Sequence, residues 1–388
     1  MKLTLSLAFL FFANALTAQV VVKPINVAVF APLYLDSVYN PVGDYKYGEL
    51  IPTFAIPGIE FYYGAKAAID SLKAGTVAYN FFVYDSKSTA KPISSLIADS
   101  SLATIDLIIA STVGNDIKQL ADYALRKNIA CISATQPNDA GVLKNPNFLL
   151  LNTTLKSNCK ALHELIQKKF SSQRIVLLTK EGKMEDRITG YYKEFENSST
   201  QNSLAIQYLS VTKASAEGEI IKNLDSTVLT TYIIASTDWE LVKTLANVVT
   251  TYQLQDQVNV MGLPTWNEAE LLNGKDFAGI RMYYPTPFIT PTSWQAKALA
   301  ATYDTNYGSE AGDNIYRGYE TVFKYCNLYN QYTKDLPTNF GSNNFTTLYT
   351  TDIQPVFTNS IKMELDYFEN KKVNITKRYS GITTTVKL

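Results

Sequence analysis

The sequence predicts an α/β protein of two lobes, each built on a mostly parallel β-sheet flanked by helices. Apolar, β-branched runs alternate with amphipathic helical segments along most of the chain. The first run, 26–35 (NVAVFAPLYL), is continuously apolar up to Pro32, which is typical of a strand buried on both faces. The alternation starts again near Asn152, and 388 residues are enough for two sizeable cores.

The first half contains five predicted strands. Pro57-Gly58 opens a helix at 59–73, and a second strand follows at 79–84, which gives the strand–helix–strand unit of a parallel sheet. The same reasoning predicts further strands at 106–110, 129–133 and 147–151, with helical segments at 92–102 and around 115–125.

The second half repeats this order. Strands are expected at 174–178, 205–209, 229–235, 258–261 and 278–284, the last of them stopped by Pro285. Helices are expected at 156–170, 186–196, 217–224 and 240–251.

The C-terminal third has a different pattern. Two helices are predicted at 293–307 and 314–332, the first ending at Gly308. Three antiparallel strands are predicted at 353–357, 362–368 and 373–378, with a hairpin turn at 369–371.

The N-terminus has the features of a signal peptide. Lys2 provides a charged start, 3–16 is apolar, and Thr17-Ala18 offers small residues for cleavage near Ala18. A membrane anchor is the alternative, but the apolar run is shorter than the roughly 20 residues of a spanning helix, and no later stretch reaches that length. We therefore expect an exported protein, periplasmic or otherwise, with residues 1–18 removed and no membrane span in the mature chain.

Composition and motifs argue against several functions. Lys plus Arg and Asp plus Glu both number 35, so no basic field favours nucleic acid. The single histidine, His163, is mid-helix and is expected at the surface or partly packed; neither a G-x-S-x-G elbow nor a phosphate loop is present. We therefore expect no enzyme activity, no cofactor and no metal. Three cysteines (Cys131, Cys159, Cys326) permit at most one disulfide, or are three buried apolar residues.

Ligands of open parallel sheets lie beyond the carboxyl ends of the strands. Hydroxyls and helix N-termini there suit a carboxylate or phosphate, Asp238 suits an ammonium group, and Tyr34 or Trp266 can stack on a ring. Ser, Thr, Asp and Asn at such positions are also ordinary helix N-caps, so both interpretations stay open. The candidate ligand-binding residues are Tyr34, Ser111, Thr112, Asn115, Ser133, Thr135, Gln136, Lys180, Ser236, Asp238, Thr265, Trp266 and Tyr284.

Three stretches carry a resemblance to a known family. They are VAVFAPL followed by FYYGAKAAIDSL, then DLIIASTVG with NIACISAT, and finally YRGYETVF at 316–323. In order and spacing they resemble the type I periplasmic binding proteins, the family of the leucine/isoleucine/valine-binding protein and related receptor ligand-binding regions.

The resemblance implies two Rossmann-like lobes joined by a three-crossover hinge. Lobe one would comprise 22–151 plus 287–335, and lobe two 152–286 plus 336–388. The hinge would lie near Asn152-Thr153, near Pro285-Thr286 and near Pro337.

Amino-acid binders of that family hold the ligand carboxylate with Ser and Thr after the third and fourth strands. Ser133 and Thr135 fit the second of these loops, whereas Asn115 stands where a hydroxyl is expected in the first. A tyrosine-rich insertion at 36–53 lies at the expected cleft rim, or is a plain surface loop.

The resemblance implies an exported solute-binding protein that captures a small polar ligand, an amino acid or related compound, and presents it to an ABC-type transporter. The alternative is a cell-envelope interaction protein that keeps the fold without a transported ligand. A coherent polar pocket at the candidate residues would favour the first function, and a filled apolar one the second.

Overall fold

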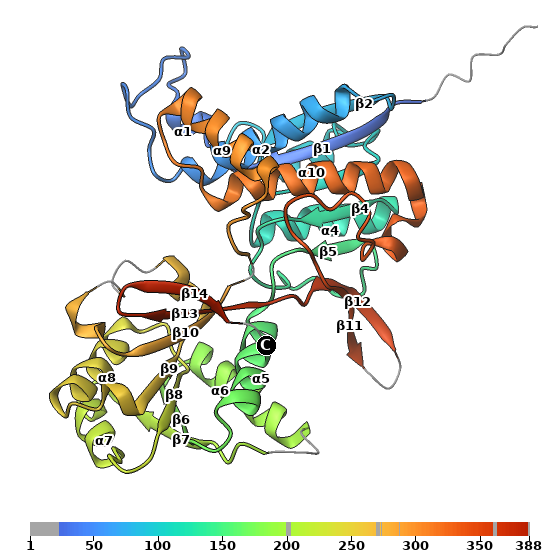
Figure 1. Cartoon of the computed structure of the whole chain (residues 1–388). Coiled ribbons are helices and arrows are strands. Elements are labelled where there is room, and N and C mark those ends of the chain that lie inside the picture. Colours follow the sequence, from blue (N-terminus) through green and yellow to red (C-terminus); the bar gives the residue numbers. More distant parts are fainter. Residues whose placement is uncertain are drawn as a thin grey trace, which may run out of the picture.

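The computed structural model describes residues 23–198, 203–268, 272, 274–286, 288–359 and 363–386. The chain forms two lobes, each a seven-stranded sheet with helices on its faces (Figure 1). The predicted signal peptide, 1–18, lies outside the described residues.

The first sheet has the order β11-β12-β5-β4-β3-β1-β2. Strands β1 to β5 and β12 run parallel to their neighbours, and β11 pairs antiparallel with β12 at one edge. The strands are β1 (Ile25–Ala31), β2 (Tyr79–Asp85), β3 (Leu107–Ala110), β4 (Ala130–Ser133), β5 (Phe148–Leu150), β11 (Ile353–Asn359) and β12 (Glu364–Asn370).

Helices cover both faces of this sheet because its central strands are apolar on both sides. α2 (Ile56–Lys73) and α10 (Asp313–Tyr332) share one buried cluster with the sheet, and α3 (Ile93–Ala98) and α4 (Asn115–Lys127) share the other. The remaining helical elements of this lobe are α1 (Leu35–Val38), α9 (Trp294–Tyr307) and the 3₁₀ segment η5 (Thr333–Asn339).

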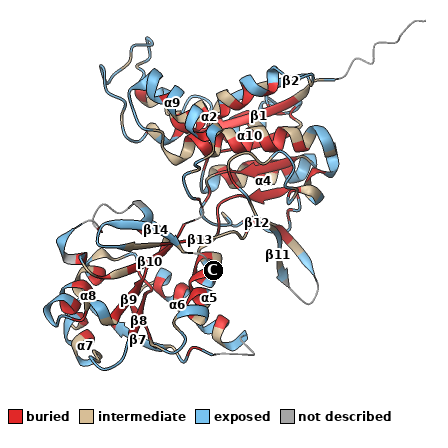
Figure 2. Cartoon of the chain, in the orientation of Figure 1, coloured by how far each residue is buried: buried red, intermediate tan, exposed pale blue. Residues whose placement is uncertain are grey.

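The second sheet has the order β14-β13-β10-β9-β8-β6-β7. Its strands are β6 (Arg174–Lys180), β7 (Gln207–Val211), β8 (Thr230–Ile234), β9 (Val258–Met261), β10 (Arg281–Thr286), β13 (Asn374–Tyr379) and β14 (Ile382–Val386). α7 (Ala216–Lys222) and α8 (Trp239–Thr251) cover one face, and α5 (Leu155–Lys169) and α6 (Lys183–Ser198) the other. Figure 2 shows the buried strands of both sheets between more exposed helices.

The two strand orders are equivalent position by position: β1 corresponds to β6, β2 to β7, and β3 to β8. The strands nearest the crossings are β5 and β12 in the first lobe and β10 and β13 in the second. The edges formed by β1–β2 and by β6–β7 are therefore on the side away from the crossings in each lobe.

The chain crosses between the lobes three times, at 151–154, between the end of β10 and the start of α9, and at 371–373. The first two crossings agree with the expected hinge positions. The third corrects the prediction near Pro337, because η5 stays in the first lobe, where Leu336 and Phe340 are fully buried.

Two further expectations for the C-terminal part are wrong. Residues 353–370 pair with the first sheet rather than the second, so 336–388 is divided between the lobes. The predicted hairpin at 369–371 is therefore part of an interlobe crossing, since β12 and β13 belong to different sheets. Pro285 also does not stop its strand, because it lies inside β10 opposite Ile375 of β13.

Hydrogen bonds tie the crossings together. The buried carboxylate of Glu369, at the end of β12, accepts from the Thr154 backbone N–H at 2.9 Å and from Ser157 Oγ at 2.7 Å, which caps α5 of the other lobe. Asn370 Nδ2 donates to the Leu151 carbonyl at 3.1 Å. The first and third crossings therefore form one joint.

Single residues that the sequence left open are also resolved. Each of the three cysteines is buried and free, which agrees with the alternative of three buried apolar residues rather than a disulfide. His163 is more deeply buried than expected, and its Nε2 lies 2.6 Å from Glu196 Oε1. Within the described ranges, no helix combines the length and apolarity needed to cross a membrane.

Candidate functional site

The carboxyl ends of β3 and β4 bring several hydroxyls of the first lobe together. Ser111 Oγ lies 3.3 Å from Thr135 Oγ1, so these two residues share a hydrogen bond across neighbouring strands. Thr112 and Ser133 are buried beside them, and neither hydroxyl oxygen has a hydrogen-bond partner among the described residues. A buried hydroxyl without a partner costs free energy, which is unusual in a stable core and typical of functional sites.

Gln136 acts as a cap rather than as an open ligand group. Its Oε1 accepts from the Gly114 backbone N–H at 2.9 Å, directly before α4, and its Nε2 donates to Asn138 Oδ1 at 2.5 Å. Asn115, the first residue of α4, is exposed. Gln136 therefore has a capping role at the start of α4, which is the alternative to ligand binding given for the polar residues after strands.

The loop after β1 is held by a carboxylate from β2. Asp85 accepts backbone N–H groups from Leu33 at 2.9 Å, Tyr34 at 3.1 Å and Leu35 at 2.7 Å. These amides would otherwise attract a ligand anion. Tyr34 has a left-handed backbone (φ 56°), and its half-buried ring lies 5.1 Å from the Phe54 ring, centroid to centroid.

In the second lobe, Lys180 at the end of β6 and Asp238 before α8 form an ion pair of 2.7 Å. Asp238 also accepts the Glu240 N–H at 3.0 Å, so it caps α8 as well. The hydrogen bond from Lys180 lowers the pKa of Asp238, and the same bond raises the pKa of Lys180. Both groups are therefore charged at neutral pH.

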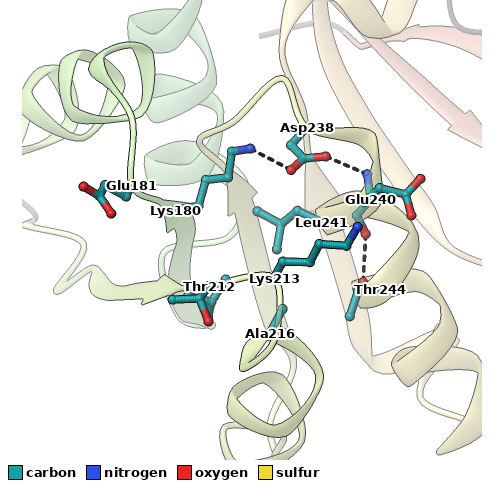
Figure 3. Close-up of a pocket in the computed structure, with 10 residues that line it drawn as sticks. Lys180, Glu181, Thr212, Lys213, Ala216, Asp238, Glu240, Leu241 and Thr244 are labelled. Atoms are coloured by element: carbon teal, nitrogen blue, oxygen red, sulfur yellow. Dashed lines mark hydrogen bonds and ion pairs between the residues drawn. The ribbon is translucent and has the colours of Figure 1, made fainter.

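This ion pair lies on the wall of a pocket of about 320 Å³ at the ends of β6 and β7 and the start of α8 (Figure 3). The pocket has an apolar part, two cationic and three anionic side chains, and two threonine hydroxyls. Its lining residues are Lys180, Glu181, Val211, Thr212, Lys213, Ala216, Asp238, Glu240, Leu241 and Thr244. A surface with both signs of charge over an apolar floor suits a small zwitterion.

Glu185 is a polar residue of this region that the sequence analysis missed. Its Oε1 accepts from the buried Ser236 Oγ at 2.7 Å, and Ser236 Oγ accepts the Asp238 N–H at 3.1 Å. The carboxylate folds back over Gly182, where a Cβ atom would lie 2.2 Å from Glu185 Oε2. Its negative charge also contributes to the raised pKa of Lys180.

Four candidates of the second lobe do not line the pocket: Ser236, whose buried hydroxyl donates to Glu185, and Thr265, Trp266 and Tyr284. Trp266 is 1% exposed and packs in the core, its ring centroid 5.8 Å from that of Trp239. Tyr284 is buried in the same cluster, and Thr265 is exposed but does not line the pocket. Among the described residues, no group of three or more His, Cys, Asp or Glu side chains could hold a metal ion.

No protein-family model matches the chain, and no curated protein sequence does. Solved structures do match, and three of them are described here with their sequence identities and TM-scores. A putative branched-chain amino acid ABC transporter protein from Rhodospirillum rubrum is 12% identical with a TM-score of 0.65, over 94% of this chain and 100% of that chain. The branched-chain amino acid transporter substrate-binding protein LivJ from Streptococcus pneumoniae, in complex with isoleucine, is 14% identical with a TM-score of 0.52, over 94% and 100%.

The third is a solute-binding protein of an ABC transporter from Rhodopseudomonas palustris in complex with 3,4-dihydroxybenzoic acid. It is 12% identical with a TM-score of 0.51, over 92% of this chain and 93% of that chain. These similarities and the two equivalent lobes show that the chain has the type I periplasmic binding protein fold. The fold expected from the sequence is thereby confirmed.

Proposed function

We propose that this protein is an exported, non-enzymatic solute-binding protein that captures a small zwitterionic ligand, an amino acid or related compound, between its lobes. The observation that carries the proposal is the charged pocket of the second lobe, which lies at the carboxyl ends of β6 and β7. The hydroxyl set of the first lobe likewise lies at the carboxyl ends of its strands, β3 and β4. A polar pocket is the outcome that favours ligand binding over the envelope interaction protein.

The two lobes offer complementary chemistry. Ser111, Thr112 and Thr135 present hydroxyls that donate to a carboxylate. Asp238 and Glu181 present carboxylates to an ammonium group, while the Lys213 ammonium adds a further site for an acidic oxygen. Closure about the three crossings would bring the two sets onto one ligand.

The transporter partnership belongs to the same proposal. The similar solved structures described above are of ABC transporter proteins, and the N-terminal residues have the pattern of an export signal. These two observations support a periplasmic location and delivery to an ABC-type transporter, and we propose no nucleic acid partner.

Thermal unfolding of the mature chain from Gln19 tests the proposal. A ligand at about 100 times its Kd adds about 2.7 kcal/mol to the free energy of unfolding, which is a readable rise in Tm. The panel should contain amino acids, sugars, nucleosides and wall peptides. Any ligand that raises Tm should lose most of its effect in Asp238→Asn, while Asp122→Asn, on the exposed surface of α4, should retain it. A panel without a single shift would favour the envelope interaction protein.

A further inference from the structure

Two acidic residues of the second lobe meet at one hydroxyl group. Ser236 Oγ donates to Glu185 Oε1 at 2.7 Å and accepts the Asp238 N–H at 3.1 Å. Asp238 caps α8 and lies on the pocket wall, whereas Glu185, in the first turn of α6, is 6% exposed and does not line the pocket. The two acidic residues therefore belong to one hydrogen-bonded network at the strand ends.

One of these two carboxylates is paired with a cation and the other is not. Lys180 Nζ lies 2.7 Å from Asp238 Oδ2, and Figure 3 shows the two groups facing each other. Glu185 forms no ion pair within the described part of the chain. Its place in the first turn of α6 compensates part of its negative charge, but a buried carboxylate is normally also paired with a cation. The network therefore has two carboxylates and one cation.

Lys180 is within reach of both carboxylates. It is the last residue of β6, and its side chain is 37% exposed, so packing does not fix its flexible four-carbon stem. The negative charge of Glu185 contributes to the raised pKa of Lys180, so the ammonium group is near enough to interact with this carboxylate as well. Rotation of the Lys180 stem can therefore exchange one carboxylate for the other.

We propose that Lys180 is an exchangeable counter-ion: the ammonium group of the ligand takes its place on Asp238, and Lys180 moves to Glu185. The proposal rests on the proposed function, because it concerns ligand binding in the same pocket. The exchange pairs both carboxylates with a cation, so no buried charge is left alone. It also makes the pocket selective, because a ligand without an ammonium group cannot replace Lys180.

Calorimetric titration of the mature chain with matched ligand pairs tests the exchange. The pairs differ only in the α-ammonium group: leucine and 4-methylpentanoate, phenylalanine and 3-phenylpropionate, glutamate and glutarate. The ammonium member should bind the wild type more tightly than its partner. In Glu185→Gln, whose amide oxygen can still accept from Ser236, Lys180 has no second anionic partner. The ammonium member should then bind about tenfold more weakly, which corresponds to one hydrogen bond to a charged group, and its partner should be unaffected.

Lys180→Met separates the exchange from a direct contact between Lys180 and the ligand. Because this substitution removes the competing cation from Asp238, the ammonium member should bind more tightly than it does to the wild type. Adding Glu185→Gln to Lys180→Met should change its affinity no further, since the second position of Lys180 no longer matters. A direct contact of Lys180 with a ligand carboxylate would instead make Lys180→Met weaken both members of every pair.

Lys222→Met and Glu217→Gln are the matched controls, because both residues are exposed on α7 and neither lines the pocket. Both variants should bind every pair as the wild type does. Weaker binding of the ammonium member to Lys180→Met, or unchanged binding to Glu185→Gln, overturns the exchange, and so does an effect of Glu185→Gln that persists beside Lys180→Met. If Glu185→Gln does not fold, the direction of the change in Lys180→Met decides alone.

The two proposals fail in different ways. If the exchange is overturned, a loss of binding in Asp238→Asn still supports the proposed function, because Asp238 then binds the ligand without displacing Lys180. No binding of any pair to the wild-type chain contradicts both proposals.

Discussion

Glu320 and Lys324 are one turn apart on α10, and both are buried charges in the first lobe. The Glu320 carboxylate accepts from Thr347 Oγ1 at 2.5 Å and from the Leu348 N–H at 2.8 Å, while Lys324 Nζ donates to Thr351 Oγ1 at 3.1 Å. Burial raises the pKa of Glu320 despite these bonds, and burial lowers the pKa of Lys324. The fold therefore disfavours the charged form of each.

The raised pKa of Glu320 predicts that this residue destabilises the folded state more as the pH rises. A carboxyl group whose pKa is raised in the folded state contributes stability below its unfolded pKa and loses it as the pH rises through the folded pKa. The free energy of unfolding of the wild type, relative to Glu320→Gln, should therefore fall as the pH rises above the ordinary glutamate pKa of about 4.3. Urea unfolding at several pH values measures this difference. The exposed Glu217→Gln should show none, and a flat or rising difference for Glu320→Gln would contradict the prediction.

At the residue scale, the sequence predicts which side chains lie together at the strand ends, whereas their role in ligand binding stays a prediction. Ser111, Thr112 and Thr135 follow strands of a parallel sheet, and Lys180 and Asp238 do so in the second lobe, so the rule for strand ends brings each set together. The rule does not separate outward from inward side chains, which is why Trp266 was chosen although it packs in the core. Glu185 was missed because it comes from the first turn of α6 and reaches the site only by folding over Gly182.

Helices α2 and α10 pack with their backbones in close approach, and two glycines make this contact possible. A Cβ atom at Gly64 would lie 1.8 Å from the Ile315 carbonyl oxygen, and one at Gly318 would lie 2.1 Å from that of Phe61. We expect Gly64→Ala to lower the free energy of unfolding by about 1–3 kcal/mol, because the helices must move apart. Chemical denaturation measures the change.

Gly190 provides the control of opposite sign. It lies inside α6, is exposed, and its Cβ position has no atom within 4 Å. Gly190→Ala should raise the free energy of unfolding by about 0.5–1 kcal/mol, because Ala loses less backbone entropy in a helix. Equal effects of the two substitutions would refute the close-packing argument.

At the scale of elements, the central strands and their helices could be predicted because a buried parallel strand is a continuous apolar run. The C-terminal strands could not be assigned to a sheet in this way. β12 and β13 have the local pattern of a hairpin, with polar residues at 369–371 between them, but their partners are β5 and β10, which are more than 80 residues earlier in the chain. Register with distant strands, rather than the turn sequence, decides which lobe each one joins.

For the whole molecule, the third crossing restrains how the lobes move. Only 371–373 separate β12 of one sheet from β13 of the other, and Lys371 Nζ is bound to Glu369 Oε2 at 2.5 Å and to Ser157 Oγ at 3.0 Å. Arg317 of α10 adds a bond to the first crossing, with its Nη1 3.2 Å from Asn152 Oδ1, and it lies 4.1 Å from the ring centre of Phe288 in the second. All three crossings are therefore held by side chains of the first lobe.

Lengthening the third crossing should loosen the two lobes without unfolding either. A Gly-Ser insertion after Lys372 removes the short tether but leaves the buried clusters of both lobes intact. We expect a larger radius of gyration and a broader distance distribution in small-angle X-ray scattering, with the Tm little changed. The same insertion after Asn343, an exposed loop position of the first lobe, should leave the scattering as it is in the wild type. If the Lys372 insertion also leaves the scattering unchanged, the first two crossings suffice to set the interlobe geometry, and the joint formed by Glu369 and Asn370 serves only to cap α5.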